Sequence, residues 1–151
     1  MKVAVGFDHR GVHLRERVLQ VLVDEGVDVV DLGVETDATR VDYPDVARDV
    51  GMAIRSGQAE RGILVCGSGV GASIAACKIA GIRAAICHDV YSAHQGVEHD
   101  DMNVLCLGAR VIGPALARDL ITTFLTATFS GEARHRRRLD KILAIEARYA
   151  R

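Results

Sequence analysis

The stretch that most constrains the fold is residues 63–71, which read Ile-Leu-Val-Cys-Gly-Ser-Gly-Val-Gly. A short apolar run rich in β-branched residues is typical of a strand buried on both faces. The run ends at Cys66, and three alternating glycines lead into residues 72–79, which resume at helical spacing. Doubly wound α/β proteins bind ligands at such a strand, turn and helix start, at the carboxyl edge of the sheet. We therefore expect the functional site here.

Cys66 has two interpretations at this position. A helix N-terminus and glycine amides favour negative charge, and they would stabilise a thiolate. The alternative is an inert, buried cysteine that closes a strand, and this stretch alone does not separate the two.

Composition limits the class of protein. The 151 residues predict a single domain, 1–151, and 49% hydrophobic but 4% aromatic residues indicate an aliphatic α/β core. A net charge of −1 offers no general attraction to nucleic acid or to an anionic membrane. The four cysteines form no CxxC pair, and we find neither a signal peptide nor a membrane-spanning run. We expect a cytoplasmic protein without nucleic-acid or membrane partners.

Apolar segments alternate regularly between strand and helix patterns. Strands are predicted over residues 2–7, 27–32, 63–66, 82–87 and 103–107, with helices between them and over 114–128 and 132–148. This order predicts a three-layer α/β/α, Rossmann-like domain with a five-stranded parallel sheet and a C-terminal helical arm.

The arm begins with a run of positive charge, Arg134 to Arg138. A cationic helix N-terminus is unfavourable unless an anion lies nearby, although a solvated charged face is the simpler interpretation. Arg134 and Arg138 are four residues apart and share a helical face, which suits a pair of guanidinium groups on one phosphate.

Polar side chains gather at the ends of the predicted strands. Asp8 and His9 follow the first strand, His88 and Asp89 follow the fourth, and Arg110 follows the fifth. The segment 99–103, His-Asp-Asp-Met-Asn, instead precedes the fifth strand, so it reaches the same edge only through a loop reversal or a second subunit. Taken singly, each histidine is an ordinary surface or capping residue.

Spacing excludes several common motifs. The glycine segment 67–71 matches neither GxGxxG nor the P-loop. A cysteine phosphatase needs an arginine six residues after the nucleophile, and that position is Ala72. A cysteine-type phosphoenzyme carrier stays open, although it would leave the histidines and arginines unexplained.

Several motifs in order carry a resemblance to a known family. They are Gly6-Phe7-Asp8-His9, Asp42-Tyr43-Pro44, the segment 66–71, the segments 80–84, 99–105 and 108–113, and Arg134-His135 through Arg138. Over nearly its whole length the chain resembles the ribose-5-phosphate isomerase B family, which includes galactose-6-phosphate isomerase subunits.

The resemblance implies a cofactor-independent aldose–ketose isomerase of phosphorylated sugars that works through an enediolate, with no metal. Cys66 would be the base, Ser68 would help to hold the oxyanion, and His99 with Asp8 would open the sugar ring. The implied substrate- and phosphate-binding residues are His9, Tyr43, Gly67, Gly69, Gly71, Asp100, Asn103, Arg110, Arg134 and Arg138. The resemblance also implies a homodimer, or a homotetramer formed from two dimers, with active sites that are shared between subunits.

The chain also departs from the family pattern. One branch places glycine at Cys66 and a glutamate base at Ala72, so the thiol branch is indicated here. Ser68 occupies a position where the family commonly has threonine, Cys77 one where it has asparagine, and Val90 one where it has proline. These differences leave the chain length of the sugar substrate open. Ribose 5-phosphate is the expected substrate. The alternatives are a tetrose 4-phosphate, allose or galactose 6-phosphate, or a non-catalytic sugar-phosphate-binding subunit.

Overall fold

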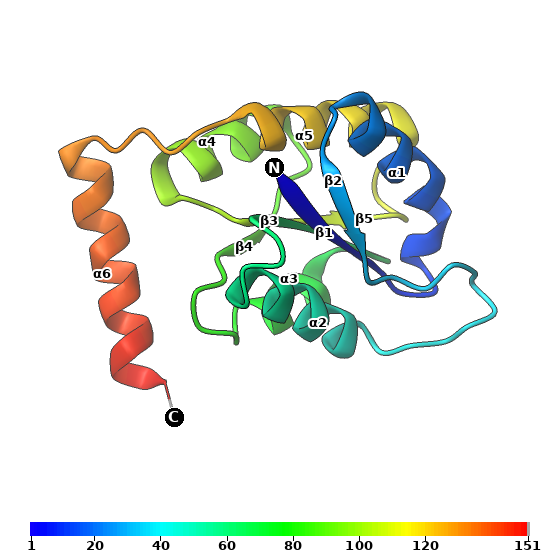
Figure 1. Cartoon of the computed structure of the whole chain (residues 1–151), viewed down its shortest axis with the longest axis horizontal. Helices are drawn as coiled ribbons and strands as arrows, with labels where there is room; N and C mark the ends of the chain where they lie inside the picture. Colours follow the sequence, from blue (N-terminus) through cyan, green and yellow to red (C-terminus); the bar gives the residue numbers. More distant parts are fainter. Residues whose placement is uncertain (151) are drawn as a thin grey trace.

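Five short apolar segments pair side by side into one parallel sheet (Figure 1). The computed structural model describes residues 1–150. The strands are β1 (Lys2–Phe7), β2 (Asp28–Asp31), β3 (Arg61–Cys66), β4 (Ala84–Ile86) and β5 (Val104–Gly108), in the spatial order β2-β1-β3-β5-β4. The predicted five-stranded parallel sheet is confirmed.

Helices cover both faces of the sheet, as the alternating pattern predicted (Figure 1). One face carries α1 (Arg15–Asp24), which follows the 3-10 turn η1 (Gly11–Leu14), together with α4 (Val90–Asp100) and α5 (Pro114–Thr126). The other face carries α2 (Tyr43–Arg55) and α3 (Val70–Ala76). The last helix, α6 (Ala133–Tyr149), forms the predicted C-terminal arm.

Burial on both faces explains why the central strands are continuously apolar. Every residue of β5 is buried, and so is every residue of β3 after Arg61. A parallel sheet with helices on both sides has no solvent-facing side, so its inner strands do not alternate between polar and apolar residues.

Several element boundaries differ from the sequence prediction, most of all those of α3 and β4. The helix expected over 72–79 begins earlier, at Val70, because Gly69 adopts the left-handed conformation (φ 84°) and starts the helix at once. It ends at Ala76, where the Lys78 and Ile79 N–H groups donate to carbonyls only three residues back. This tight turn delays the fourth strand, which spans Ala84–Ile86 rather than 82–87.

The chain reverses its direction across the sheet between β1 and β3. From β1 it goes outward to β2, and it then crosses back to β3 on the other side of β1. β1 pairs with β2 on one side and with β3 on the other, with Phe7 opposite Val65. β3 in turn pairs with β5, with Cys66 opposite Gly108. Such a switch point leaves a crevice beyond the carboxyl ends of the strands.

The arm helix α6 stands beside the amino ends of the strands, apart from the sandwich (Figure 1). Only His135 and Leu139 of this helix are buried, whereas Ile142, Leu143 and Ile145 are exposed. No helix within residues 1–150 combines the length and apolar character needed to cross a membrane.

Stability depends on how closely η1 approaches β3. A Cβ atom at Gly11 would lie 1.9 Å from the carbonyl oxygen of Val65, whereas one at Gly113 would meet nothing within 4 Å. Gly11→Ser should therefore lower the free energy of unfolding by about 1–3 kcal/mol or more. Gly113→Ser, the matched control, should change it by less than about 0.5 kcal/mol. Urea unfolding of both variants measures the difference, and equal midpoints would contradict the close packing.

Candidate active site

A polar cavity of about 220 Å³ opens at the carboxyl ends of β1 and β3, at the switch point of the sheet. Its lining residues come from three segments that are far apart in the sequence: Asp8, His9, Arg10, Val41, Asp42, Tyr43, Cys66, Gly67, Ser68 and Gly71. The expectation of a pocket after the central strand is thus met by the geometry.

The Cys66 thiol is positioned by the turn that follows it. The side chain is 5% exposed, and the backbone N–H of Gly69 donates to Sγ over 3.2 Å. The left-handed conformation at Gly69 aims this N–H back at the sulfur. An N–H group directed at a thiol stabilises negative charge on the sulfur, as a base or a nucleophile requires.

The same turn is fixed against the end of β5. Backbone N–H groups of Ala109 and Arg110 donate to the carbonyls of Cys66 and Gly67, over 2.9 Å and 3.0 Å. A Cβ atom at Gly108 would lie 2.7 Å from the backbone of Ser68, so only glycine permits this approach. The turn is therefore held rigidly around the cavity.

Asp8 shapes the loop that follows β1. Its Oδ1 accepts hydrogen bonds from the N–H groups of Arg10 (2.9 Å) and Gly11 (2.7 Å), and the residue is 5% exposed. Both bonds fall on one oxygen, so the other oxygen can accept a hydrogen bond from a ligand in the cavity.

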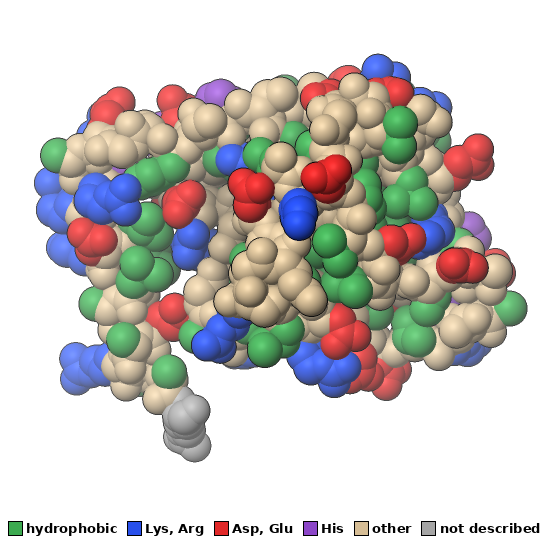
Figure 2. All heavy atoms as spheres, in the orientation of Figure 1, with side chains coloured by type: hydrophobic (Ala, Val, Ile, Leu, Met, Phe, Trp, Pro, Cys, Tyr) green, Lys and Arg blue, Asp and Glu red, His purple; other side chains and the backbone are tan. Residues whose placement is uncertain are grey.

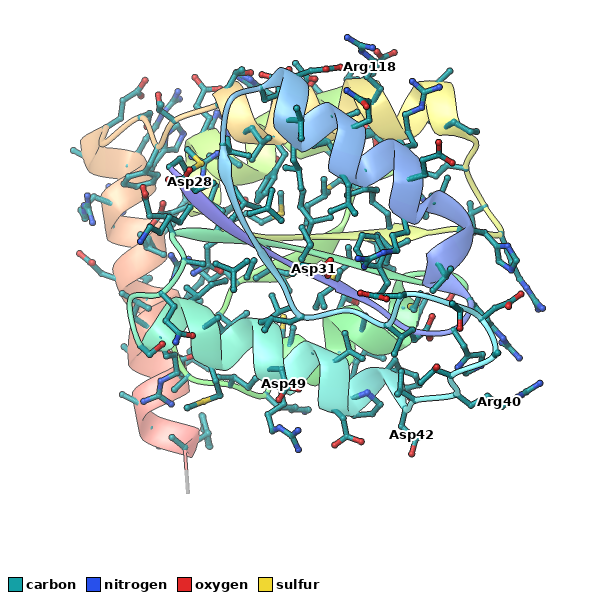
Figure 3. The ribbon with its side chains drawn as sticks, turned by 45° about the vertical axis from the view of Figure 1, so that its right-hand side comes forward. Asp28, Asp31, Arg40, Asp42, Asp49 and Arg118 are labelled. Carbon is teal, nitrogen blue, oxygen red and sulfur yellow. The ribbon has the colours of Figure 1, made fainter. Side chains whose placement is uncertain are left out.

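His9 lies between two hollows. It lines the polar cavity and also a neighbouring one bordered by Arg40, Asp42 and Asp49. Figure 3 shows Arg40 and Asp42 on the loop that leads into α2, with Asp49 farther along that helix. Within residues 1–150, His9 Nδ1 is the one buried side-chain polar atom that has no hydrogen-bond partner. An unpaired buried donor or acceptor at a cavity marks a position where a ligand can complete the bonding.

Tyr43 closes the cavity from the first turn of α2. A Cβ atom at Gly71 would lie 2.6 Å from the Tyr43 ring, so the third glycine of the motif makes room for this ring. Tyr43 lines the cavity and remains 43% exposed.

His88 and Asp89, after β4, are engaged with the backbone. The Gly108 N–H donates to His88 Nε2 over 3.0 Å, and burial lowers the pKa of His88, which favours the neutral ring. Asp89 accepts from the Ser92 N–H at 2.7 Å and caps α4, and this bond lowers the pKa of its carboxyl group. Both residues support the frame of the site.

His99 lies at the far end of α4, away from Cys66. Its ring stacks on that of His135, with centroids 3.9 Å apart, and its Nδ1 lies 3.0 Å from Gln95 Nε2. His135 also bonds Ser130 through Nδ1 at 2.5 Å, and burial together with nearby His99 and Arg134 lowers its pKa. The stack joins α4 to α6 at the amino edge of the sheet.

The other predicted residues also lie at the amino edge of the sheet. The Asn103 side chain donates to the carbonyl of Gly81 (2.9 Å) and accepts from the N–H of Arg83 (2.8 Å), so it holds the turn before β4 rather than lining the cavity. Arg134 and Arg138 are on α6, where Arg134 pairs with Glu132 over 3.0 Å.

A second, larger hollow of about 450 Å³ separates α6 from the sandwich, and we call it the α6 groove. Its lining residues are Cys77, Ile82, Arg83, Ala84, Ala85, Gly96, Asp100, Met102, Ile142, Leu143, Ile145 and Glu146. Figure 2 shows hydrophobic side chains on α6 beside this gap. Asp100 therefore borders an apolar groove and not the polar cavity.

One chain thus gathers about half of the predicted site. Asp8, His9, Tyr43, Cys66, Gly67, Ser68 and Gly71 line the cavity, and Gly69 and Arg110 bond its turn through their backbone. His99, Asp100, Asn103, Arg134 and Arg138 lie elsewhere in the same chain. Sequence reasoning missed Arg10, Val41 and Asp42, although Arg10 follows His9 directly and Asp42 precedes Tyr43. Within residues 1–150, no group of three His, Cys, Asp or Glu side chains is arranged to hold a metal ion.

The fold and the cavity define an α/β protein with a thiol-lined polar cavity at the switch point of its sheet. Residues 3–142 match the profile of the Ribose/Galactose Isomerase family, and the chain belongs to this family. The resemblance inferred from the motifs is confirmed.

Named relatives cover almost the entire chain. Ribose-5-phosphate isomerase B of Escherichia coli is 45% identical over 147 residues, which is 97% of each chain. D-erythrulose-4-phosphate isomerase of Pectobacterium atrosepticum is 41% identical over 87% of this chain and 86% of its own. The structure of ribose-5-phosphate isomerase B from Clostridium thermocellum superposes with a TM-score of 0.94 at 45% identity and covers 99% of both chains.

The four cysteines should differ in their reaction with iodoacetamide. Burial raises the pKa of Cys87 to about 11 and raises that of Cys106 as well. A thiol with a pKa near 11 is about one-thousandth thiolate at pH 8, so neither residue should react in the folded protein. Exposed Cys77 and cavity-lining Cys66 should be alkylated. Peptide mapping by mass spectrometry measures this, and early labelling of Cys106 would contradict the burial.

Proposed function

We propose that the protein interconverts an aldose phosphate and a ketose phosphate, with ribose 5-phosphate and ribulose 5-phosphate as its main pair. The observation that carries the proposal is the polar cavity in which Cys66 receives the Gly69 N–H and Asp8 and His9 face the same space. The names and structures of the relatives support ribose 5-phosphate as the substrate.

Each residue of the cavity has a role that suits this reaction. Cys66, as thiolate, takes the proton from C2 of the open-chain aldose and returns it to C1, while a hydroxyl proton moves from O2 to O1. Ser68 and backbone N–H groups around the glycine turn stabilise the intermediate enediolate. Asp8, with His99, opens the furanose ring beforehand. The sugar neither gains nor loses electrons overall, so the reaction needs no redox partner.

Two of the arginines assigned to the phosphate, Arg134 and Arg138, do not lie at the cavity of their own chain. We assign phosphate binding to His9 and Arg110 on one chain and to Arg134 and Arg138 on another. His99 and the arginines of α6 lie at the opposite edge of the sheet from Cys66. A twofold partner presents them to Cys66 without any rearrangement of the fold, and it builds two such sites at once.

The second copy also covers the apolar surface that one chain leaves open. The α6 groove is lined largely by apolar residues, of which Ile142, Leu143 and Ile145 are exposed. Surfaces of this kind mark protein–protein interfaces. We propose a homodimer, able to pair again into a tetramer, in which α6 grips the partner.

The names of two relatives support two candidate sugars for this protein. The Escherichia coli relative carries the name of a five-carbon sugar phosphate, and the Pectobacterium relative that of a four-carbon one. A four-carbon substrate is therefore the second candidate. With ribose 5-phosphate as substrate, the enzyme would serve pentose phosphate metabolism in the cytoplasm, where the free cysteines of residues 1–150 stay reduced.

A panel of aldose phosphates tests the proposal. Purified protein is assayed with erythrose 4-phosphate, ribose 5-phosphate and allose 6-phosphate, and ketose formation is followed. We expect the highest kcat/KM with ribose 5-phosphate, the sugar named in the Escherichia coli and Clostridium thermocellum relatives, and the lowest with allose 6-phosphate, because the cavity of about 220 Å³ is small for a six-carbon sugar. A higher value with the four-carbon sugar would favour the second candidate, and conversion of no sugar would indicate a non-catalytic subunit.

Complementation tests the shared site. The variants Cys66→Ala and His99→Asn, each inactive alone, are unfolded together and refolded. Random pairing makes half of the dimers mixed, and each mixed dimer holds one intact site and one doubly damaged site, so activity should return to roughly a quarter of wild type.

Each variant refolded alone is the control for this experiment. Native mass spectrometry of the mixture, with one variant isotope-labelled, shows that mixed dimers form. An inactive mixture that contains mixed dimers would mean that Cys66 and His99 act within one chain.

A further inference from the structure

Arg10 is a cation of the cavity that has no role in the proposed reaction as described so far. It lines the same cavity as Cys66 and Ser68, directly after His9 in the sequence. It is the only arginine among the cavity-lining residues, because Arg110 contacts the turn through its backbone and Arg134 lies on α6.

The backbone of Arg10 is held in place on two sides. Asp8 Oδ1 accepts a hydrogen bond from the Arg10 N–H over 2.9 Å. Because Gly11 has no side chain, η1 packs directly against the carbonyl of Val65. The position of Arg10 relative to the end of β3 is therefore set by packing, as a binding residue requires.

The Arg10 side chain runs across the glycine turn. A Cβ atom at Gly67 would lie 3.2 Å from Arg10 Cδ and 3.7 Å from Nη1, so the guanidinium group passes beside Gly67. The Gly67 carbonyl accepts the N–H of Arg110 over 3.0 Å. The side chain of Arg10 and the backbone of Arg110 thus both contact Gly67.

The guanidinium group of Arg10 has no carboxylate partner among residues 1–150. Its neighbour Asp8 uses Oδ1 for two backbone N–H groups. An unpaired guanidinium beside His9, whose buried Nδ1 also lacks a partner, favours an anion.

We propose that Arg10 is a further phosphate-binding residue, contributed by the subunit that supplies Cys66. It binds the phosphate of the sugar together with His9 and Arg110, so that this half of the site holds phosphate before the arginines of a second copy add to it. The inference rests on the proposed sugar-phosphate isomerase function, but it concerns binding and not the proton transfer.

Phosphate binding to the Arg10→Gln variant tests the assignment. Calorimetry with inorganic phosphate should give a Kd about tenfold higher than wild type, because a charge-assisted hydrogen bond at an exposed side chain is lost. KM for ribose 5-phosphate should rise in parallel while kcat changes little. Arg10→Lys, which keeps the charge but not the planar fork, should recover part of the affinity.

Arg55→Gln is the matched control, because Arg55 is an exposed arginine at the end of α2 that lies away from the cavity. It should leave Kd and KM unchanged, and the ligand-free Tm should match wild type in all variants. An unchanged phosphate Kd in Arg10→Gln, or a wild type that binds no phosphate, would overturn the proposal.

A loss of kcat at constant Kd would also overturn it, because the guanidinium would then act at the reacting carbon atoms. If wild-type protein converts no aldose phosphate, the proposed function fails, yet the ratio of phosphate Kd values still decides the role of Arg10.

Discussion

The close backbone contact between the Cys66–Gly69 turn and the end of β5 is the constraint on which the site depends. Gly108 permits the contact because it has no side chain, and the Ala109 N–H donates a hydrogen bond to the backbone carbonyl of Cys66. With the turn fixed, the Gly69 N–H points at the thiol. The cavity is therefore preorganised, and negative charge on sulfur or on a bound oxyanion meets dipoles that are already oriented.

The fold and half of the site were predictable from the sequence because both depend on local patterns. Continuous apolar strands and glycine turns follow from burial on both faces and from close backbone approach. The sequence also predicted that residues 99–103 precede the fifth strand, and His99 and Asn103 lie there, at the edge of the sheet opposite Cys66. Asn103 also resembles a ligand-binding side chain in sequence, but both ends of its amide bond the turn at Gly81 and Arg83. Arg10 was missed because a single arginine in a loop carries no periodic signal.

The two edges of the sheet divide the chemistry between them. The carboxyl edge carries the thiol, Asp8 and His9, whereas the amino edge carries the stacked histidines and the arginines of α6. A parallel sheet cannot bring its two edges together within one chain. The apolar α6 groove also lies at the amino edge, so the proposed dimer contact and the residues proposed to complete the site of a second copy belong to the same surface.

Hydrogen exchange at the sugar tests the role of Cys66 most directly. Ribose 5-phosphate is incubated with the protein in D2O, and nuclear magnetic resonance follows deuterium entering at C2 of the aldose and C1 of the ketose. The wild type should exchange these positions, because a base that holds the substrate proton shares it with solvent. Cys66→Ala should show no exchange while it still binds inorganic phosphate with a Kd close to wild type. Exchange at the wild-type rate in Cys66→Ala would contradict the assignment of the thiol as the base.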